Sequence, residues 1–302
     1  MTQGESDKTA GATTEGLRVQ IGAQLTVSGA PTALAEALRA AHRFPNPAYL
    51  EALRSGRRPF GIPRELEIYA DLAEGLSLPR GYLPELRTHL HGQGPVIWVE
   101  RRSHAPRTYP AAQGHTLRPY QEQAVAAALA AGEGLLTMPT GAGKTVTAME
   151  LLRQRGERAL ILVHSRDLLE QWQRVLGEYM GIEAGGIQGS RQKEGEVVTV
   201  AMIQTLQRRL ETLEGLLTGY GLVLLDEAHR APARTVAEIL NRAPCRYRYG
   251  LTATPYRRDG LDLLIHRAVG PVLLEIGRAE VEATGGVVPA VVRPIETGCH
   301  PG

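Results

Sequence analysis

The octet at residues 138–145, Met-Pro-Thr-Gly-Ala-Gly-Lys-Thr, constrains the fold of this chain more than any other segment. It follows the apolar run 135–138, which is typical of a buried strand, and it opens segment 144–152, whose apolar residues recur with helical spacing. A strand, a glycine turn and Lys-Thr at a helix start form the arrangement that holds nucleotide phosphates. The sequence therefore predicts a strand, a phosphate-binding loop and a helix in this order.

The loop residues fit this chemistry because they leave the backbone accessible to an anion. Gly141 and Gly143 allow close approach of a phosphate, with backbone N–H groups directed inward. The N-terminus of the following helix adds partial positive charge. We expect Thr140 and Ala142 to complete the nucleotide-binding loop.

The last two residues of the octet supply the charged and metal-binding groups. Lys144 is long enough to reach the β and γ phosphates of ATP, and the Thr145 hydroxyl is a suitable ligand for Mg²⁺. The usual pattern has glycine where this chain has Met138. The alternative interpretation is a glycine-rich turn with a solvated lysine.

Composition places the chain among ordinary globular proteins and excludes few functions. A length of 302 residues favours two domains, and a net charge of +2 is too weak to indicate a nucleic-acid partner. Cys245 and Cys299 lack the spacing of a metal site and suggest a reducing compartment. No apolar run reaches the length of a membrane span, and residues 1–16 are typical of a disordered tail. We therefore expect a cytoplasmic protein without a membrane partner.

The strand and helix patterns in the first part of the chain predict a small α+β accessory domain over residues 17–103. Its expected strands are 17–29, 66–72 and 75–78, and its expected helices are 31–42, 48–55 and 84–91. Residues 104–116 are rich in Pro, Gly, Ala and His, which predicts a linker.

From residue 117 to 302 the sequence alternates between helical and extended patterns. Helices are expected at 118–131, 143–155, 166–179, 203–214, 233–242 and 260–269. Strands are expected at 134–138, 159–163, 197–202, 221–225, 247–251, 271–276 and 287–292. This alternation predicts an α/β fold, a parallel sheet with helices on both faces.

A second signal is the pair Asp226-Glu227, which follows the apolar run 222–225. Ligands of open α/β sheets bind beyond the carboxyl ends of the strands, so this pair and the phosphate loop should share one edge. Asp226 suits a water-mediated contact with Mg²⁺, and Glu227 suits orienting and deprotonating an attacking water. The alternative is an acidic helix start that only favours the helix dipole.

A third signal is the segment 251–255, Leu-Thr-Ala-Thr-Pro, at the end of another predicted strand. The hydroxyls of Thr252 and Thr254 are placed to bond the acidic pair and His229. As an isolated pentapeptide it carries little weight, because threonine is common in strands.

Taken together, segments 117–121, 138–145, 226–229 and 251–255 resemble the motifs of superfamily 2 helicases of the DEAH-box type. The continuation of the last segment, Tyr-Arg-Arg-Asp at 256–259, is similar to the XPB-like branch. Arg258 departs from the Arg-Glu-Asp found there, which leaves the role of that triplet open. The resemblance covers residues 117 to about 290 and implies a RecA-like lobe that binds ATP, Mg²⁺ and DNA.

The resemblance also implies roles for residues outside the phosphate loop. Gln121 would read the adenine edge and Arg118 would help to hold that site. Ser165 and Arg166 would contact DNA phosphates. The next candidates for DNA contact are Gln204 and Thr205. The alternative for these last four is a helix cap or a solvated surface residue.

Superfamily 2 motors have two RecA-like lobes, and the second supplies arginines to the bound ATP. No Gln-x-x-Gly-Arg-x-x-Arg motif occurs in this sequence, and 285–289 resembles the approach to a second lobe. We therefore expect a fragment that contains the first lobe and has almost no ATP turnover alone. Its partner would be the second RecA-like lobe of the full-length protein.

The accessory domain carries arginines beside aromatic residues but no catalytic constellation. Arg57 and Arg58 stand next to Pro-Phe-Gly at 59–61, a combination that suits phosphate contact and base stacking. The resemblance implies a domain that senses distorted DNA. The alternative is a solvated basic face.

Three functions remain open from the sequence. The first is the front part of an XPB-like DNA helicase or translocase acting in DNA repair. The second is the motor subunit of a restriction system, although no nuclease-type cluster precedes the motor motifs. The third is a nucleic-acid-binding module without turnover of its own.

Overall fold

The computed structural model of the chain describes residues 16–230, 232–254 and 260–284. Contacts within the chain divide it into two compact units, residues 1–102 and 103–302, called unit 1 and unit 2 here. Within the described residues, no helix combines the length and the apolar character needed to cross a membrane.

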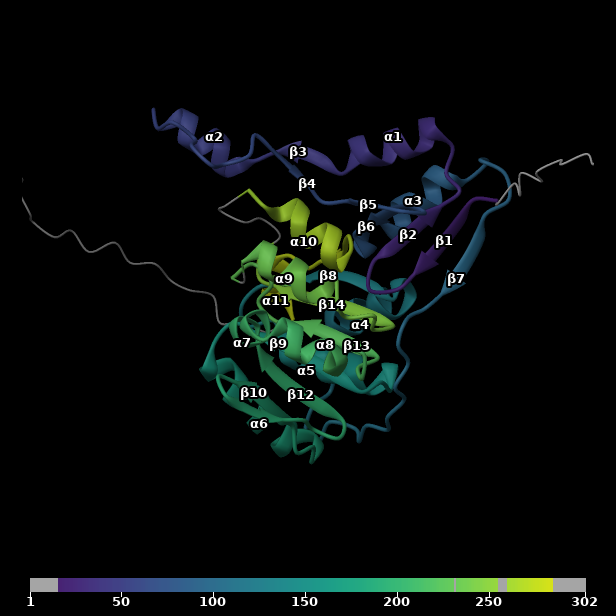
Figure 1. Cartoon of the computed structure of the whole chain (residues 1–302). Coiled ribbons are helices and arrows are strands. Elements are labelled where there is room, and N and C mark those ends of the chain that lie inside the picture. Colours follow the sequence, from purple (N-terminus) through teal and green to yellow (C-terminus); the bar gives the residue numbers. More distant parts are fainter. Residues whose placement is uncertain (1–15, 231, 255–259, 285–302) are drawn as a thin grey trace, which may run out of the picture. The chain divides into compact units, whose positions relative to one another are not determined.

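Unit 1 is an α+β unit built on a five-stranded sheet in the order β5-β6-β2-β1-β7 (Figure 1). The strands are β1 (Arg18–Ile21), β2 (Leu25–Ser28), β5 (Ala70–Leu72), β6 (Gly75–Leu78) and β7 (Ile97–Glu100). A second sheet pairs β3 (Arg43–Pro45) with β4 (Glu65–Glu67). The helices are α1 (Thr32–Ala41), α2 (Pro47–Arg54), the 3₁₀ turn η1 (Arg80–Tyr82) and α3 (Leu83–Leu90). The buried faces of the larger sheet and of α3 form the core of this unit.

Two segments of unit 1 that were each predicted as one strand contain two strands in the structure, so these predictions are wrong. The segment 17–29 is a hairpin of β1 and β2, because the chain reverses where the Gly22 N–H bonds the Gln24 carbonyl at 2.9 Å. The segment 66–72 is divided between β4 and β5, which lie in different sheets. The edge strand β7 was not predicted, since Trp98 and its neighbours lack an alternating burial pattern.

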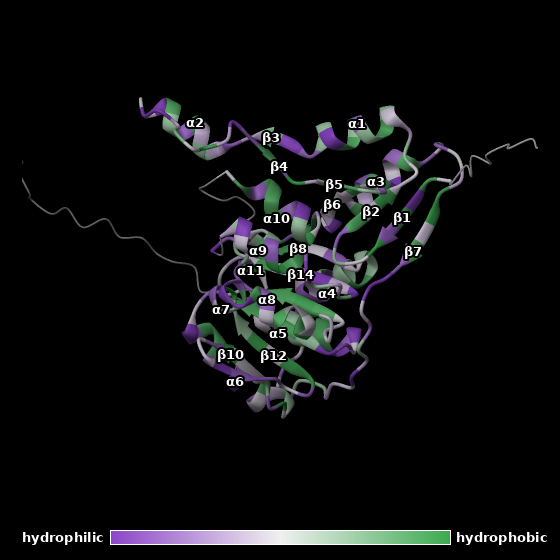
Figure 2. Ribbon diagram, in the orientation of Figure 1, coloured by the Kyte–Doolittle hydropathy of each residue, from purple (hydrophilic) through white to green (hydrophobic). Residues whose placement is uncertain are grey.

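Unit 2 contains an eight-stranded sheet in the order β11-β10-β12-β9-β13-β14-β8-β15. Every pair in it is parallel except β10 with β11. The strands are β8 (Glu133–Thr137), β9 (Ala159–Val163), β10 (Gly185–Gln188), β11 (Arg191–Lys193), β12 (Val198–Met202), β13 (Leu222–Leu225), β14 (Tyr247–Thr252) and β15 (Val272–Glu275). The central strands are buried apolar runs, and Figure 2 shows β12 and β13 as hydrophobic.

Helices cover this sheet on two faces. They are α4 (Pro119–Ala131), α5 (Lys144–Arg155), α6 (Arg166–Met180), α7 (Ile203–Arg208), α8 (Leu210–Leu217), α9 (Ala233–Leu240), α10 (Asp262–Val269) and α11 (Arg278–Ala283). The Tyr249 hydroxyl contacts α4 and α5, whereas its neighbour Arg248 bonds carbonyls at the ends of α9 and α10. Because successive strand residues point to opposite faces, these helix pairs lie on opposite sides. The prediction of a parallel sheet between helices is confirmed.

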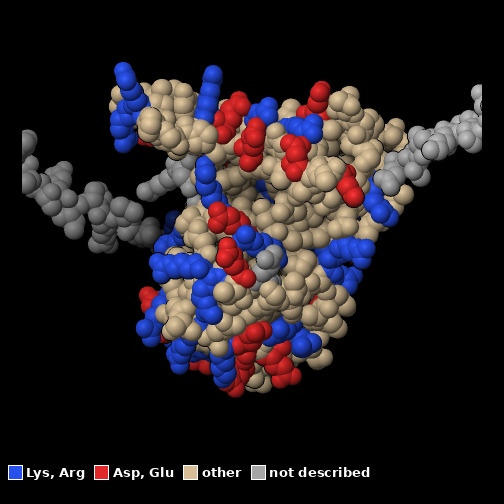
Figure 3. All heavy atoms as spheres, viewed as in Figure 1, with Lys and Arg blue, Asp and Glu red and all other residues tan. Residues whose placement is uncertain are grey.

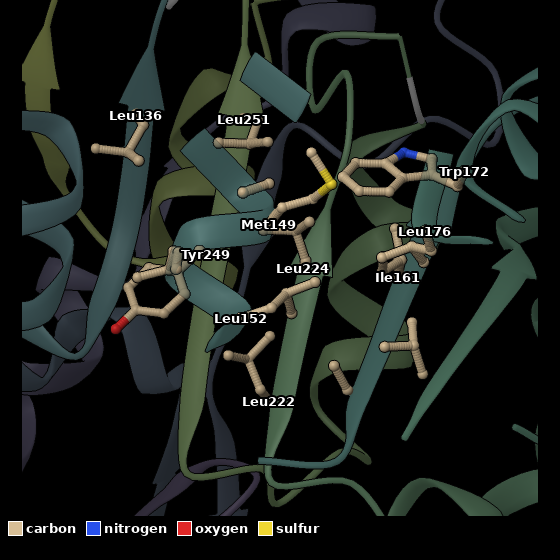
Figure 4. Packing of buried hydrophobic residues seen from close by; sticks show 14 of the residues in the cluster. Leu136, Met149, Leu152, Ile161, Trp172, Leu176, Leu222, Leu224, Tyr249 and Leu251 are labelled. Carbon is tan, nitrogen blue, oxygen red and sulfur yellow. The ribbon is translucent and has the colours of Figure 1, made fainter. Parts of the chain in front are cut away.

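The core of unit 2 lies between the sheet and helices α4, α5 and α6. Figure 4 shows part of this cluster, with Met149 and Leu152 from α5 and Trp172 and Leu176 from α6 beside the strand residues. The last turn of α5 is bound to the sheet through Arg155, which donates to the Tyr249 hydroxyl at 2.8 Å.

Three details of unit 2 differ from the expectations. The helix expected at 203–214 is two helices, because the backbone leaves helical geometry at Arg209. The hairpin β10–β11 and helix α11 were not predicted. The strand expected at 287–292 lies outside the described residues.

The segment expected to be a linker, 104–116, packs on unit 2. The Tyr109 side chain is buried and its hydroxyl donates to the Glu157 carbonyl at 2.7 Å. The buried Glu157 carboxylate also accepts from the Ala105 N–H at 2.6 Å and lies against His104. These contacts make the segment an arm of unit 2.

We predict that Arg248→Leu lowers the free energy of unfolding by on the order of 3 kcal/mol, measured by urea denaturation followed by circular dichroism. Arg248 is fully buried and donates to the carbonyls of Leu240, Ala243 and Ala268, which the variant leaves without these donors. Arg153→Leu, on the surface of α5, is the control and should change the value by less than about 1 kcal/mol. Equal losses in both variants would contradict this role of Arg248.

Candidate functional site

The phosphate loop begins where β8 ends. Met138 is fully buried in the core cluster, and its N–H bonds the carbonyl of Thr252 on β14 at 2.9 Å. A residue at this position therefore continues the strand and fills the core before the chain turns. This explains how the loop accommodates methionine where the usual pattern has glycine.

The turn itself depends on two glycines with left-handed backbone geometry. Gly141 has φ +84° and Gly143 has φ +77°, a region that side-chain-bearing residues rarely adopt. Gly143 is also the N-cap of α5, so the N–H groups of the first helical turn open toward the loop. Thr140 and Gly141 are exposed, whereas Ala142 is buried and anchors the turn.

The start of α4 supports the loop from behind. The Gln121 side chain is buried, and its amide N–H donates to the Ala142 carbonyl at 2.9 Å. The amide oxygen accepts from the Arg118 N–H at 2.9 Å. The Tyr120 hydroxyl donates to the same Ala142 carbonyl at 3.2 Å. Gln121, which we expected to read adenine, therefore makes its contacts here with the phosphate loop.

Lys144 extends from the first turn of α5 toward the acidic pair. Its Nζ lies 3.3 Å from the Met138 carbonyl oxygen and 3.7 Å from Glu227 Oε1. The second distance is longer than a hydrogen bond, so no tight ion pair holds the ammonium group. The next residue, Thr145, is half-buried beside it. Both side chains are thus placed at the mouth of the loop.

Asp226 follows β13 and is held by hydrogen bonds on both carboxylate oxygens. Oδ1 accepts from the Glu227 N–H at 2.9 Å, and Oδ2 accepts from the indole N–H of Trp172 at 2.8 Å. Burial raises the pKa of the Asp226 carboxyl, whereas the bond from Trp172 lowers it. The side chain is therefore a buried carboxylate with a fixed orientation.

Glu227 is the one described residue other than glycine with positive φ, at +51°. This conformation turns the chain sharply after Asp226 and directs Glu227 toward both Lys144 and His229. Nδ1 of His229 lies 3.2 Å from Glu227 Oε2 and 3.1 Å from the Thr252 hydroxyl. Such backbone strain is found at functional sites, where the surrounding structure holds it.

The two threonines at the end of β14 differ in their contacts. Thr252 is buried, and its hydroxyl donates to the Thr254 carbonyl at 2.6 Å. Thr254 is exposed and takes part through its backbone. Thr252 therefore joins His229 to the strand, and the direct bond from a threonine to the acidic pair that the sequence suggested is replaced by this contact through His229.

The donor set fits Mg²⁺ held together with a nucleotide. Among the described residues, no group of three or more His, Cys, Asp and Glu side chains is placed to hold a metal ion alone. Mg²⁺ in phosphate-transfer sites commonly uses one or two protein oxygens together with phosphates and water. The Thr145 hydroxyl and the Asp226 carboxylate, on the two sides of the loop mouth, supply such oxygens.

Comparisons with known proteins agree with this arrangement. Residues 114–257 match the family model described as "Type III restriction enzyme, res subunit". The "DNA 3'-5' translocase XPB2" of Sulfurisphaera tokodaii is 34% identical over 170 residues, which are 56% of this chain and 37% of that protein. The "DNA 3'-5' helicase XPB" of Mycobacterium tuberculosis is 32% identical over 191 residues, 59% of this chain and 34% of that protein. Residues 114–257 are therefore similar to this family, and about half of the chain is similar to the XPB helicases and translocases.

A solved structure supports the same fold. The UvsW helicase from bacteriophage T4 matches 85% of this chain and 98% of the compared chain with a TM-score of 0.62. Its 16% sequence identity makes this a likeness of fold alone. The chain spans about a third of the length of the two XPB proteins it matches.

The candidate DNA contacts of unit 2 differ in exposure. Ser165 caps α6, with its hydroxyl accepting from the Leu168 N–H at 3.4 Å. Arg166 is two-thirds exposed and pairs with Glu170 at 2.7 Å. Both lie at the carboxyl edge of the sheet, where β9 ends.

Gln204 and Thr205 lie at the start of α7, and their side chains are partly committed to the fold. Gln204 donates to the His164 carbonyl at 3.1 Å, and its buried Oε1 has no hydrogen-bond partner among the described residues. The buried Thr205 hydroxyl accepts from the Gly189 N–H at 2.9 Å. Thr205 therefore supports the turn between β10 and β11.

The candidate DNA contacts of unit 1 are on its surface. Figure 3 shows basic side chains gathered at the end of α2, where Arg54, Arg57 and Arg58 are exposed. The neighbouring Phe60 side chain is 98% exposed. This tip combines positive charge with an accessible aromatic ring.

Sequence reasoning missed Trp172, which lies 54 residues before its partner Asp226. Its position on the apolar face of α6 predicts a core residue, and no motif connects it to the acidic pair. The segment 256–259, on which the XPB-like continuation rests, lies outside the described residues.

The strained backbone at Glu227 predicts a difference between two variants that both remove the carboxylate. Glu227→Gly should have a free energy of unfolding about 1 kcal/mol higher than Glu227→Ala, because glycine adopts positive φ without a steric cost. Urea denaturation of the two variants measures this difference. A more stable alanine variant would show that position 227 has ordinary backbone geometry.

Proposed function

We propose that this chain is the nucleotide- and DNA-binding front part of an ATP-dependent DNA helicase or translocase that acts in DNA repair. The proposal includes the division into a tail at 1–16, an accessory domain at 17–103 and a helicase lobe that begins at 117. Because the chain spans about a third of its XPB relatives, hydrolysis and movement on DNA are proposed for a protein that also contains a second RecA-like lobe.

One observation carries the nucleotide part of the proposal. The loop after β8 and the acidic pair after β13 meet across the end of β14, with Lys144 Nζ 3.7 Å from Glu227 Oε1. The loop presents helix N–H groups and a lysine for phosphates, while the opposite side presents two carboxylates. The positive side of the site attracts an anion and the negative side attracts a divalent cation. A nucleotide phosphate bound together with Mg²⁺ therefore complements both sides.

Each side chain of the site then has one task. Lys144 would bind the β and γ phosphates. Thr145 would hold Mg²⁺ through its hydroxyl, and Asp226 would hold it through a water molecule. When bound, Mg²⁺ neutralises charge on the phosphate oxygens. Glu227 orients the attacking water and accepts its proton.

The remaining residues of the site connect it to its surroundings. We assign Arg118 and Gln121 to the base side of the nucleotide. Gln121, which accepts from the Arg118 N–H, supports the loop through the Ala142 carbonyl. Glu227 is connected to the end of β14 by a chain of contacts. These contacts run through His229 and Thr252 to the Thr254 backbone. We assign this path to the coupling of nucleotide state to DNA.

Lys144→Ala should weaken binding of ADP with Mg²⁺ about 10- to 100-fold, measured by isothermal titration calorimetry. The reason is the loss of a charged donor to the phosphates at a site that offers no second lysine in the loop. Lys193→Ala is the matched control, because Lys193 is exposed on β11 and pairs with Glu183. Equal affinity in the Lys144 variant and the intact chain would refute the site.

DNA contacts are proposed on both units. In the helicase domain they are the carboxyl-edge residues Ser165, Arg166, Gln204 and Thr205, of which Arg166 is the most exposed. In unit 1 they are Arg57 and Arg58 beside Phe60, where the guanidinium groups bind phosphates and the ring stacks on a base. A domain that stacks on unpaired bases suits the detection of distorted DNA.

Replacing Arg57 and Arg58 together with alanine should weaken DNA binding and reduce the slope of log K against log salt concentration by about 2. Fluorescence anisotropy with a labelled oligonucleotide at several salt concentrations measures both quantities. The matched control replaces Arg39 and Arg43, which pair with Asp71 and Glu67 and carry the same total charge. An unchanged slope in the first variant would remove this tip from the DNA interface.

Two other functions are compatible with parts of the molecule. The similarity to the res subunit of type III restriction enzymes favours a restriction-system motor as the second candidate. A nucleic-acid-binding module without turnover describes the chain if ATP is bound and never hydrolysed. Joining a second lobe that supplies arginines should restore hydrolysis to a helicase and leave such a module inactive.

A further inference from the structure

Trp172 connects helix α6 to the acidic end of β13. Trp172 is only 2% exposed, and its Nε1–H donates to Asp226 Oδ2 at 2.8 Å. A buried indole N–H needs an acceptor, and a carboxylate is a stronger one than a neutral carbonyl. The pair is therefore a charge-assisted hydrogen bond inside the protein.

The position of the indole ring is fixed by packing. Trp172 belongs to the core cluster that includes Met149 of α5 and Leu169 and Leu176 of α6 (Figure 4). Leu169 and Leu176 share the apolar face of α6 with Trp172, and Met149 adds a neighbour from α5, so the ring cannot turn away without opening the core. The N–H is consequently presented to Asp226 at a constant place.

The carboxylate receives one hydrogen bond on each oxygen. Oδ1 accepts from the Glu227 N–H and Oδ2 from Trp172, so the plane of the carboxylate is set by two donors from different elements. Each oxygen keeps a further acceptor position for a metal-bound water. The Glu227 donor comes from a strained turn, whereas Trp172 ties the Asp226 side chain to the core.

We propose that Trp172 is a positioning residue for Mg²⁺, which holds Asp226 in the orientation that the metal-bound water requires. This inference rests on the proposed nucleotide site. It adds to that site a residue of α6, the helix that begins at the candidate DNA contacts Ser165 and Arg166. The hydrogen bond from Trp172 to Asp226 thus connects the proposed metal site, after β13, to the helix that carries these candidate DNA contacts.

The test compares the intact chain with Trp172→Phe, which keeps an aromatic ring and removes the N–H donor. ADP binding is measured with a fluorescent ADP analogue, first in EDTA and then across a titration of Mg²⁺. We expect the Mg²⁺ concentration at half-maximal effect to rise on the order of 10- to 100-fold, as for other groups that orient metal ligands. Affinity in EDTA should change less than about twofold, because Lys144 and the loop hold the phosphates.

A merely structural tryptophan would behave differently in this comparison. Its loss would lower the thermal midpoint and weaken ADP binding equally with and without Mg²⁺. The matched control is Trp98→Phe, which changes the only other tryptophan of the chain, on the surface strand β7 of unit 1. This control should leave both measurements unchanged.

A second variant covers the case in which Trp172→Phe does not fold. In the Trp98→Phe chain, Trp172 is the only tryptophan, so biosynthetic incorporation of benzothienylalanine replaces its N–H by sulfur within the same ring shape. The same rise in the Mg²⁺ requirement is expected. This variant changes the hydrogen bond while the packing is retained.

The outcomes separate this inference from the proposed function. If the intact chain binds ADP with a Mg²⁺ requirement that neither Trp172 variant alters, the positioning role is overturned and the nucleotide site stands. If the intact chain binds no ADP with Mg²⁺ at millimolar concentrations, both the site and the role of Trp172 are overturned. A selective rise in the Mg²⁺ requirement supports both.

Discussion

The parallel register of β8, β14 and β13 determines where every group of the nucleotide site lies. Thr137 pairs with Thr252, and Gly250 pairs with Leu225, so the three strands end at one edge. Backbone bonds continue beyond the strands, from the Met138 N–H to β14 and from the Ala228 N–H to the Leu251 carbonyl. Phosphate loop and acidic pair are therefore held by the sheet itself, and a slip of one residue would separate them.

Polar side chains fasten the sheet to the helices on both of its faces. Arg248 bonds carbonyls at the ends of α9 and α10, and Arg155 joins the end of α5 to Tyr249 on the opposite face. Trp172 adds a third connection, from α6 to the carboxylate of Asp226. Pre-organised groups of this kind lose little freedom when a ligand binds. Among the described residues other than glycine, only Glu227 has a positive φ.

The sequence predicted the parts of this arrangement that depend on local patterns. The buried strands, the glycine turn before Lys144 and the acidic pair have signatures that need no knowledge of distant residues. Long-range contacts have none, so the bond from Trp172 to Asp226 and the contact of Gln121 with the loop could not be foreseen. Short strands such as β10 and β11 were missed because glycines and exposed polar residues dominate them. The arm at 104–116 has a linker composition, and its packing depends on the buried Glu157.

A crystal structure of the chain with Mn²⁺ in place of Mg²⁺ and a non-hydrolysable ATP analogue tests the nucleotide site directly. Anomalous scattering locates the metal independently of the protein geometry. One Mn²⁺ should lie between the Thr145 hydroxyl and Asp226, with the phosphates on the N–H groups of residues 141–145. A nucleotide bound elsewhere, or a metal ion remote from Asp226, would contradict this expectation.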